Sequence, residues 1–449
     1  MRYMGIRKVE KAIVFEKIVD PVLDYAGEDS AKIIKELGLL SSNDFILRAW
    51  WRWRPGSPPR RYDELAKKIT EIRSFSKVII SGGIHAITIW RRDYDDYLYK
   101  WINYPETWQM AFDPTKFGIP ISKEMYNCQY IKKQGFSYPL PCTAFHPCLA
   151  SNYAPDLTNS AYQTFLYHMG LRQVESGCNA VWIDAWLWVA SDMVRVTGDP
   201  KHPAVKAIVT GFNAVGDMLR KSGALVSTWY SKVPFRQKID IVTINAATPQ
   251  EILNFKISEE RIENEIREVR RVVGNVPIAA FIDWGGASPS MYAFSQQLSP
   301  EKQSKFLIYA TEFYKSYPEI TFVYPVMGGT MGRIGQGPTI KSFGKFDVYC
   351  SFAPEFRTYD TIKKLLTKER VIKPVIREKV VRPATKVKPC EEELKALREQ
   401  IKAANREVAI ARQKYMQTKS REDYIQLLRA SRKAHRLWER YQVLRRRCQ

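Results

Sequence analysis

Residues 180–186 read AVWIDAW and residues 278–286 read IAAFIDWGG. Each is a short apolar run that ends on an aspartate with tryptophan close by. A run of this kind, without polar alternation, is typical of a strand buried on both faces of a parallel sheet. An aspartate at the end of such a strand loses water, so its pKa can be adjusted for chemistry. We therefore expect Asp184 and Asp283 to form a carboxylate pair at the mouth of a β/α barrel.

Strand-like and helix-like runs alternate from about residue 45, which indicates a parallel α/β domain. Eight strands with intervening helices over about 320 residues fit a (β/α)8 TIM barrel. An open doubly wound sheet is the less favoured alternative, because no Gly-x-Gly-x-x-Gly follows the first expected strand. The expected strands are 45–53, 77–85, 139–146, 179–186, 224–230, 240–245, 277–284 and 321–326. The expected helices are 61–73, 121–134, 158–175, 203–222, 248–273, 299–316 and 356–368.

The sequence predicts four segments. Residues 1–44 form an N-terminal extension that packs on the barrel, residues 45–370 form the barrel, and residues 371–389 form a basic, Pro-containing linker. In residues 390–449, apolar residues step by three and four, which is typical of an α-helical coiled coil. We expect these last residues to form a helical hairpin, with dimerisation through the same seam as the alternative.

Positive charge is concentrated in the tail. The chain has a formal net charge of +23, and residues 367–449 hold 24 Lys and Arg against ten Asp and Glu. The charge therefore says little about the barrel's ligand, and it suggests an acidic partner, nucleic acid or an acidic membrane surface for the tail. The coiled-coil pattern adds a homo-oligomer or another protein as a partner.

Seven cysteines are scattered along the chain without a Cys-x-x-Cys, which argues against a disulfide scaffold or a zinc ribbon. The N-terminus carries charges where a signal peptide needs its apolar core, and no run approaches the ~18 apolar residues of a membrane span. We expect a cytoplasmic protein without a transmembrane segment. Cys142, His146 and Cys148 match no common zinc spacing, so we expect neither a metal nor another cofactor.

In a barrel of this kind, function is built from residues at the C-terminal ends of the strands. The candidates there are rich in aromatic rings and hydrogen-bonding side chains. Flat rings suit the apolar faces of sugars, and carboxylates, His and Asn suit their hydroxyl groups. The expected catalytic residues are Asp184 and Asp283, and the expected substrate-binding residues are Trp50, Arg52, His85, His146, Trp186, Trp229, Tyr230, Asn245, Trp284 and Tyr324.

The chain resembles the broad group of (β/α)8 glycoside hydrolases. The resemblance lies in GCNAVWIDAW at 177–186, APDLTNSAYQTFL at 154–166 and PIAAFIDWGG at 277–286. It implies a glycosidase in which Asp184, on the fourth strand, is a catalytic carboxylate. For the pair of carboxylates on strands four and seven we predict a retaining enzyme with Asp184 as nucleophile and Asp283 as acid–base, and an inverting enzyme or exchanged roles stay open. The chain departs from amylase-like barrels, which place Arg where this chain has Trp182 and carry Glu after strand five.

Two alternatives stay open. The glycine-rich stretch at 327–337 follows the last expected strand, where barrels often bind phosphate. That position suggests an enzyme acting on a phosphorylated metabolite. The other alternative is a non-enzymatic scaffold, in which the barrel is a binding module and the helical tail carries the function.

Overall fold

The computed structural model describes residues 8–52, 61–136, 138–184, 187–283, 290–328 and 340–367, together with single positions at 397, 399, 400, 403, 407, 410 and 426. The chain divides into two compact units, Met1–Glu369 and Arg370–Gln449. Each unit is described by itself below.

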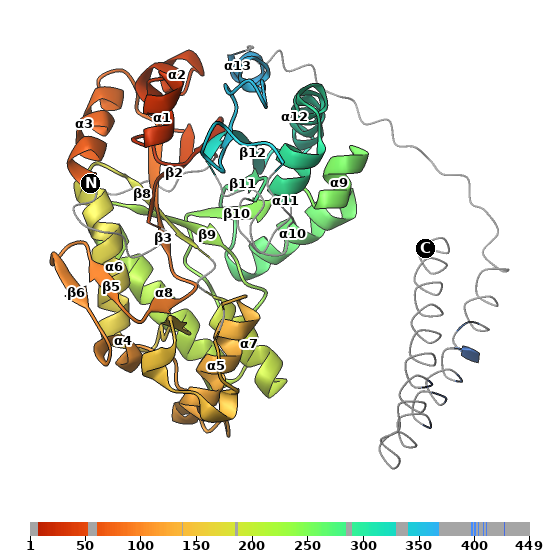
Figure 1. Cartoon of the computed structure of the whole chain (residues 1–449). Coiled ribbons are helices and arrows are strands. Elements are labelled where there is room, and N and C mark those ends of the chain that lie inside the picture. Colours follow the sequence, from red (N-terminus) through yellow and green to blue (C-terminus); the bar gives the residue numbers. More distant parts are fainter. Residues whose placement is uncertain are drawn as a thin grey trace. The chain divides into compact units, whose positions relative to one another are not determined.

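The first unit is built around a closed parallel barrel of eight strands (Figure 1). In barrel order the strands are β1 (Ala12–Phe15), β2 (Phe45–Arg52), β3 (Ile79–His85), β8 (Ala180–Asp184), β9 (Leu225–Trp229), β10 (Ile241–Asn245), β11 (Ile278–Phe281) and β12 (Ile320–Gly328). Parallel pairing of β1 with both β2 and β12 closes the barrel. The strands are buried almost throughout, as their mainly apolar sequences predict. The expected barrel is confirmed.

Helices cover the outside of the barrel and connect successive strands (Figure 1). They are α1 (Pro21–Ala26), α2 (Ser30–Glu36), α3 (Tyr62–Arg73), α6 (Ser160–Glu175), α7 (Trp188–Thr197), α8 (Pro203–Lys221), α9 (Pro249–Asn254), α10 (Glu259–Val272), α11 (Ser290–Tyr292), α12 (Pro300–Tyr314) and α13 (Tyr359–Thr367). A π-helical turn, Ala293–Gln297, follows α11, and the short strand β13 (Tyr349–Cys350) pairs antiparallel with the end of β12. The single helix expected at 248–273 is two helices, because Phe255 adopts a left-handed φ of 51°.

Two expectations about the strands are wrong. The barrel begins before residue 45: AIVF at Ala12–Phe15 belongs to the segment expected to pack on the barrel, and it supplies the first strand instead. Residues 139–146 form no strand but contain a 3-10 turn, Cys142–Ala144. Pro139 and Pro141 lack the backbone donors that a ladder needs. Since one strand is gained and one is lost, Asp184 and Asp283 still follow the fourth and seventh barrel strands.

A long insertion connects β3 to β8. It contains the paired strands β4 (Ile89–Trp90) and β7 (Asn152–Tyr153), the hairpin of β5 (Asp93–Asp95) and β6 (Lys100–Ile102), and the helices α4 (Glu106–Gln109) and α5 (Lys123–Lys133). Two further 3-10 turns lie at Pro114–Phe117 and Pro147–Leu149. A disulfide joins Cys128 of α5 to Cys142, which the sequence analysis did not anticipate. None of the helices in the described part of the chain has the length and apolar character that a membrane crossing requires.

The described positions of the second unit, such as Leu397 and Glu407, are helical. The predicted linker at 371–389 and most of the predicted coiled coil lie outside the described residues. The linker, the helical hairpin and its partners therefore stay predictions.

Candidate active site

Three carboxylates lie at the C-terminal ends of barrel strands. Asp184 is the last residue of β8, Asp283 follows β11 by two residues, and Glu16 directly follows β1. Asp283 and Glu16 are the two carboxylates whose charges raise the pKa of Asp184. The two aspartates expected from the sequence are therefore brought into one electrostatic neighbourhood, with a third acid beside them.

Burial governs the chemistry of Asp184, which is 7% exposed. Burial raises the pKa of this carboxyl to about 7, because water no longer stabilises the charged form. The Arg48 guanidinium opposes that rise, Asp283 and Glu16 add to it, and a hydrogen bond donated by Trp229 lowers the pKa again. Asp184 can therefore hold a proton or release it near neutral pH.

His85 lies beside Asp184. The two residues end neighbouring strands and are paired in register, with His85 Nδ1 4.0 Å from Asp184 Oδ2. The other ring nitrogen, Nε2, lies 3.1 Å from Thr88 Oγ1. This geometry places an imidazole at hydrogen-bonding contact with a hydroxyl on one side and close to the carboxylate on the other.

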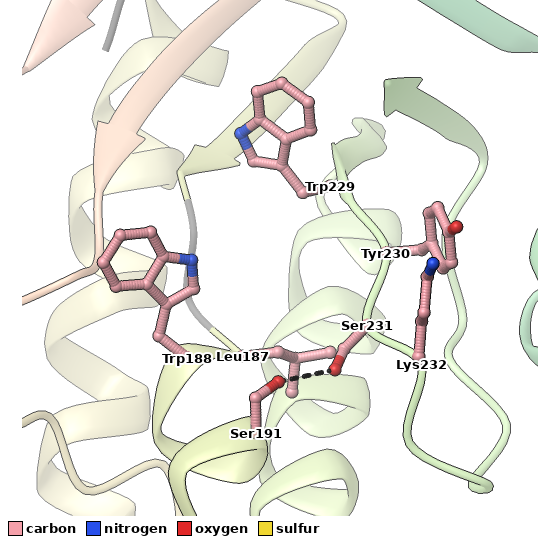
Figure 2. Close-up of a pocket in the computed structure, with 7 residues that line it drawn as sticks. All are labelled: Leu187, Trp188, Ser191, Trp229, Tyr230, Ser231 and Lys232. Atoms are coloured by element: carbon pink, nitrogen blue, oxygen red, sulfur yellow. Dashed lines mark hydrogen bonds between the residues drawn. The ribbon is translucent and has the colours of Figure 1, made fainter. Parts of the chain in front are cut away.

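A cavity of about 330 Å³ lies at the end of β9, where Trp229 is one of its lining residues (Figure 2). Its walls come from the start of α7 and from the segment after β9, and its lining residues are Leu187, Trp188, Ser191, Trp229, Tyr230, Ser231 and Lys232. The hydroxyls of Ser191 and Ser231 are hydrogen-bonded at 3.0 Å, which ties the two walls together (Figure 2). Trp229 lines the cavity and also lowers the pKa of Asp184, so this side chain links the cavity wall to the carboxyl electrostatically.

Strand β2 carries a bulge that changes which side chains face the barrel interior. From Ile46 to Trp50 the strand advances four residues while β3 advances two, and Arg48 adopts a left-handed φ of 58°. Arg48 and Trp51 both contact the Trp182 ring, although their odd spacing would put them on opposite faces of a regular strand. The bulge therefore turns Arg48 and Trp51 inward.

Trp50 and Arg52 consequently lie away from the mouth, contrary to expectation. The Trp50 ring packs on Tyr62 of α3 at 5.4 Å. Arg52 is 1% exposed and binds Asp93 at 2.7 Å and Asp96 at 2.6 Å, so it anchors the insertion.

Tyr324 and His146 also lie elsewhere. The Tyr324 hydroxyl lies 2.9 Å from Thr311 Oγ1 of α12, so this side chain points out of the barrel. His146 is exposed in the insertion, where its Nδ1 is 2.9 Å from Cys148 Sγ. Among the residues the structure describes, no group of three or more His, Cys, Asp or Glu is placed to hold a metal ion.

The remaining candidates lie at or near the mouth. Tyr230 lines the cavity and donates its hydroxyl hydrogen to Glu265. Asn245 ends β10 and donates to Ser290 Oγ at 3.0 Å. Trp186, Trp284 and the glycine-rich stretch from 329 lie outside the described residues, so their roles stay predictions.

Glu16 and Arg48 were not predicted from the sequence, whereas Trp51 was recognised as a residue at the end of its strand without a prediction of its direction. Glu16 follows the apolar run AIVF, so it fits the same pattern that identified Asp184 and Asp283. Arg48 is a charged residue inside the otherwise apolar run FILRAWW, which is itself a signal. The inward orientation of Trp51 depends on the bulge, and the position of the bulge cannot be predicted from the sequence.

No protein-family model matches the chain, and no curated protein matches its sequence. Solved structures that match the chain include a debranching enzyme from Nostoc punctiforme, at 10% identity and a TM-score of 0.42, covering 78% of this chain and 71% of that one. The alpha-amylase from H. orenii has 11% identity and a TM-score of 0.41, with 81% and 80% covered. The glycoside hydrolase domain of PelA from Pseudomonas aeruginosa has 10% identity and a TM-score of 0.31, with 62% and 93% covered. Likeness at these levels does not assign the chain to any family.

Proposed function

We propose that this chain is a glycoside hydrolase that cleaves O-glycosidic bonds with Asp184 and Asp283. The observation that carries the proposal is the pairing, at the mouth of a barrel, of a buried carboxyl whose pKa is about 7 with a second carboxylate. Glycoside hydrolysis needs one carboxylic acid that keeps its proton near neutral pH and one carboxylate that does not.

The electrostatics favour Asp184 as the acid, which reverses the roles expected from the sequence. In a retaining cycle, Asp184 gives its proton to the leaving oxygen while the Asp283 carboxylate attacks the anomeric carbon and the glycosidic bond breaks. Asp184 then accepts a proton from water, whose oxygen attacks the anomeric carbon and releases the sugar from Asp283. A carboxyl that titrates near pH 7 serves both as acid and as base.

The cavity that Trp229 lines supplies a binding surface for a sugar ring. Trp188, Trp229 and Tyr230 offer aromatic faces for the apolar side of a sugar, and Ser191 and Ser231 offer hydroxyls for its rim (Figure 2). Trp229 would connect substrate binding to the acid, because it lines the cavity and also lowers the pKa of Asp184.

Hydrolysis of a panel of aryl α- and β-glycosides by the full chain tests the proposal. We expect turnover in the wild type and a fall of roughly 10²- to 10⁴-fold in Asp184→Asn and Asp283→Asn. The matched control is Asp156→Asn, which removes another fully buried carboxylate that bonds Thr158 and Lys116 in the insertion. This control should keep its activity.

The variant Glu16→Gln separates the two acids beside Asp184. If Asp283 is the nucleophile, Glu16→Gln keeps most of the turnover and Asp283→Asn does not. Activity that survives in both aspartate variants would remove them from the mechanism. The configuration of the first-formed sugar, followed by NMR, shows retention or inversion.

A further inference from the structure

Arg48 combines two features that local structure alone disfavours. It is a charged residue only 4% exposed in the middle of an apolar barrel strand, and it holds a left-handed φ of 58° without being glycine. Burying a cation costs solvation, and a long side chain in this backbone region is strained. The left-handed backbone and the buried side chain together bring the guanidinium into the barrel interior. Because both are unfavourable by themselves, we infer that a cation is required at this place.

Aromatic rings from three strands hold the guanidinium. Its central carbon lies 4.1 Å from the Trp182 ring centroid, 4.7 Å from that of Trp51 and 5.6 Å from that of Phe281. These distances are typical of cation–π contacts. Within the described part of the chain, the buried Nε of Arg48 has no hydrogen-bond partner.

The charged and titratable groups that act on Asp184 come from four other elements. Arg48 comes from β2, Glu16 follows β1, His85 ends β3 and Asp283 follows β11, while Trp229 of β9 is an uncharged donor. Among these groups Arg48 is the permanent cation, since His85 is charged only when it is protonated. Three carboxylates in one mouth repel one another, and a fixed positive charge beside them lowers that cost.

Trp182 precedes Asp184 by two residues on β8, so the guanidinium held on the Trp182 ring lies on the same face of that strand as the Asp184 carboxyl. We propose that Arg48 is a positioning residue for Asp184: a fixed internal cation, held on an aromatic bed, that favours the charged form of this carboxyl. The inference rests on the proposed function for its catalytic meaning, and its electrostatic content can be measured without any substrate. Arg48 acts through Asp184 and does not itself touch the reacting sugar.

The direct test is the titration of Asp184 in the full chain, with aspartate carboxyls labelled with ¹³C and the Asp184 signal assigned by its loss in Asp184→Asn. In Arg48→Met the titration midpoint should move above that of the wild type, because the cation that favours the carboxylate is gone. In Arg48→Lys, which keeps the charge, the midpoint should stay closer to the wild type. A folded Arg48→Met protein with an unchanged midpoint would overturn the inference.

Arg48→Gln is the second neutral variant, for the case in which Arg48→Met does not fold, and it should shift the midpoint in the same direction. If the glycosides are turned over, the alkaline limb of the pH–rate profile should shift upward in both neutral variants and less in Arg48→Lys. A shifted midpoint in a protein that hydrolyses no glycoside would refute the proposed function and leave the inference standing. An unshifted midpoint in a folded variant that still hydrolyses glycosides would refute the inference about Arg48 and leave the proposed function standing.

Discussion

Strand β2 carries two buried arginines, four residues apart, whose lost hydration is compensated by different kinds of contact. Arg52 is bound by two carboxylates, Asp93 and Asp96, and by the carbonyl of Tyr94 at 2.7 Å. Arg48 lies on aromatic rings and exerts its charge on Asp184. A fully satisfied ion pair is what a structural anchor requires, whereas a cation held on rings is available to tune a neighbour.

The largest effect should come from removing the structural arginine. Arg52→Met leaves Asp93 and Asp96 buried without their cation, so we expect a loss of about 3–5 kcal/mol in the free energy of unfolding. Urea denaturation measures it. The matched control is Arg220→Met, since Arg220 pairs with Asp217 and Asp240 nearer the surface and should cost about 1 kcal/mol or less. Equal losses of unfolding free energy in the two variants would show that the buried Arg52 ion pairs stabilise the fold no more than the Arg220 ion pairs do.

Asp184→Asn should show that the site facing Arg48 is organised for chemistry rather than for stability. The pKa of Asp184 is raised to about 7, so its contribution to stability is fully present below the unfolded pKa of about 4 and is lost as pH rises through 7. At pH 8 the variant should therefore be more stable than the wild type by up to about 4 kcal/mol.

This advantage of Asp184→Asn should shrink as the pH falls toward 4, where the wild-type carboxyl is neutral in the folded state and increasingly neutral in the unfolded chain. Thermal and urea unfolding at pH 4.5, 6 and 8 follow the trend. A variant that loses stability at pH 8 would contradict the raised pKa. A variant that gains stability without losing any ligand binding would favour the scaffold hypothesis.

The inward orientation of Trp51 gives a third test. A Cβ added to Gly83 of β3 would lie 2.5 Å from a carbon of the Trp51 ring, which is closer than such atoms approach. Gly83→Ala should therefore lower the free energy of unfolding by about 1–3 kcal/mol, measured by urea denaturation, and disturb the aromatic rings that hold Arg48. Gly118→Ala is a control for glycine loss at a left-handed turn without a close neighbour. If Gly83→Ala costs no more than this control, Trp51 does not face the interior as described.

The same bulge marks the limit of what the sequence could predict. Apolar runs in β2, β3, β8, β9, β10, β11 and β12 were recognisable because a strand buried on both faces needs no polar alternation. The run AIVF at Ala12–Phe15 was visible but short, and only the pairing with β2 and β12 shows that it closes the barrel.

Side-chain direction was predicted less well than strand position. Asp184 and His85 end their strands, so their place at the mouth follows from the parallel order. Arg48, Trp50, Trp51 and Arg52 depend on a left-handed residue and a shifted register, and a change of register exchanges the two faces of a strand. No local pattern in FILRAWWR determines where that shift occurs.

The smallest effect should come from Tyr324, which the strand pattern assigned to the substrate. Its hydroxyl lies 2.9 Å from Thr311 of α12, so Tyr324→Phe removes the hydrogen bond to Thr311 on the outside of the barrel. We expect a loss of about 0.5–1.5 kcal/mol in stability and no change in KM or kcat. Thr311→Val should cost at least as much stability, because it also removes the hydrogen bond from Thr311 Oγ1 to the carbonyl of Leu307 at 2.6 Å. The double variant should cost less than the sum of the two single variants, because both remove the bond between Tyr324 and Thr311. A raised KM in Tyr324→Phe alone would show that Tyr324 contacts the substrate. The assignment of side chains to the inside and the outside of the barrel, on which the contrast of Arg48 with Arg52 depends, would then be wrong.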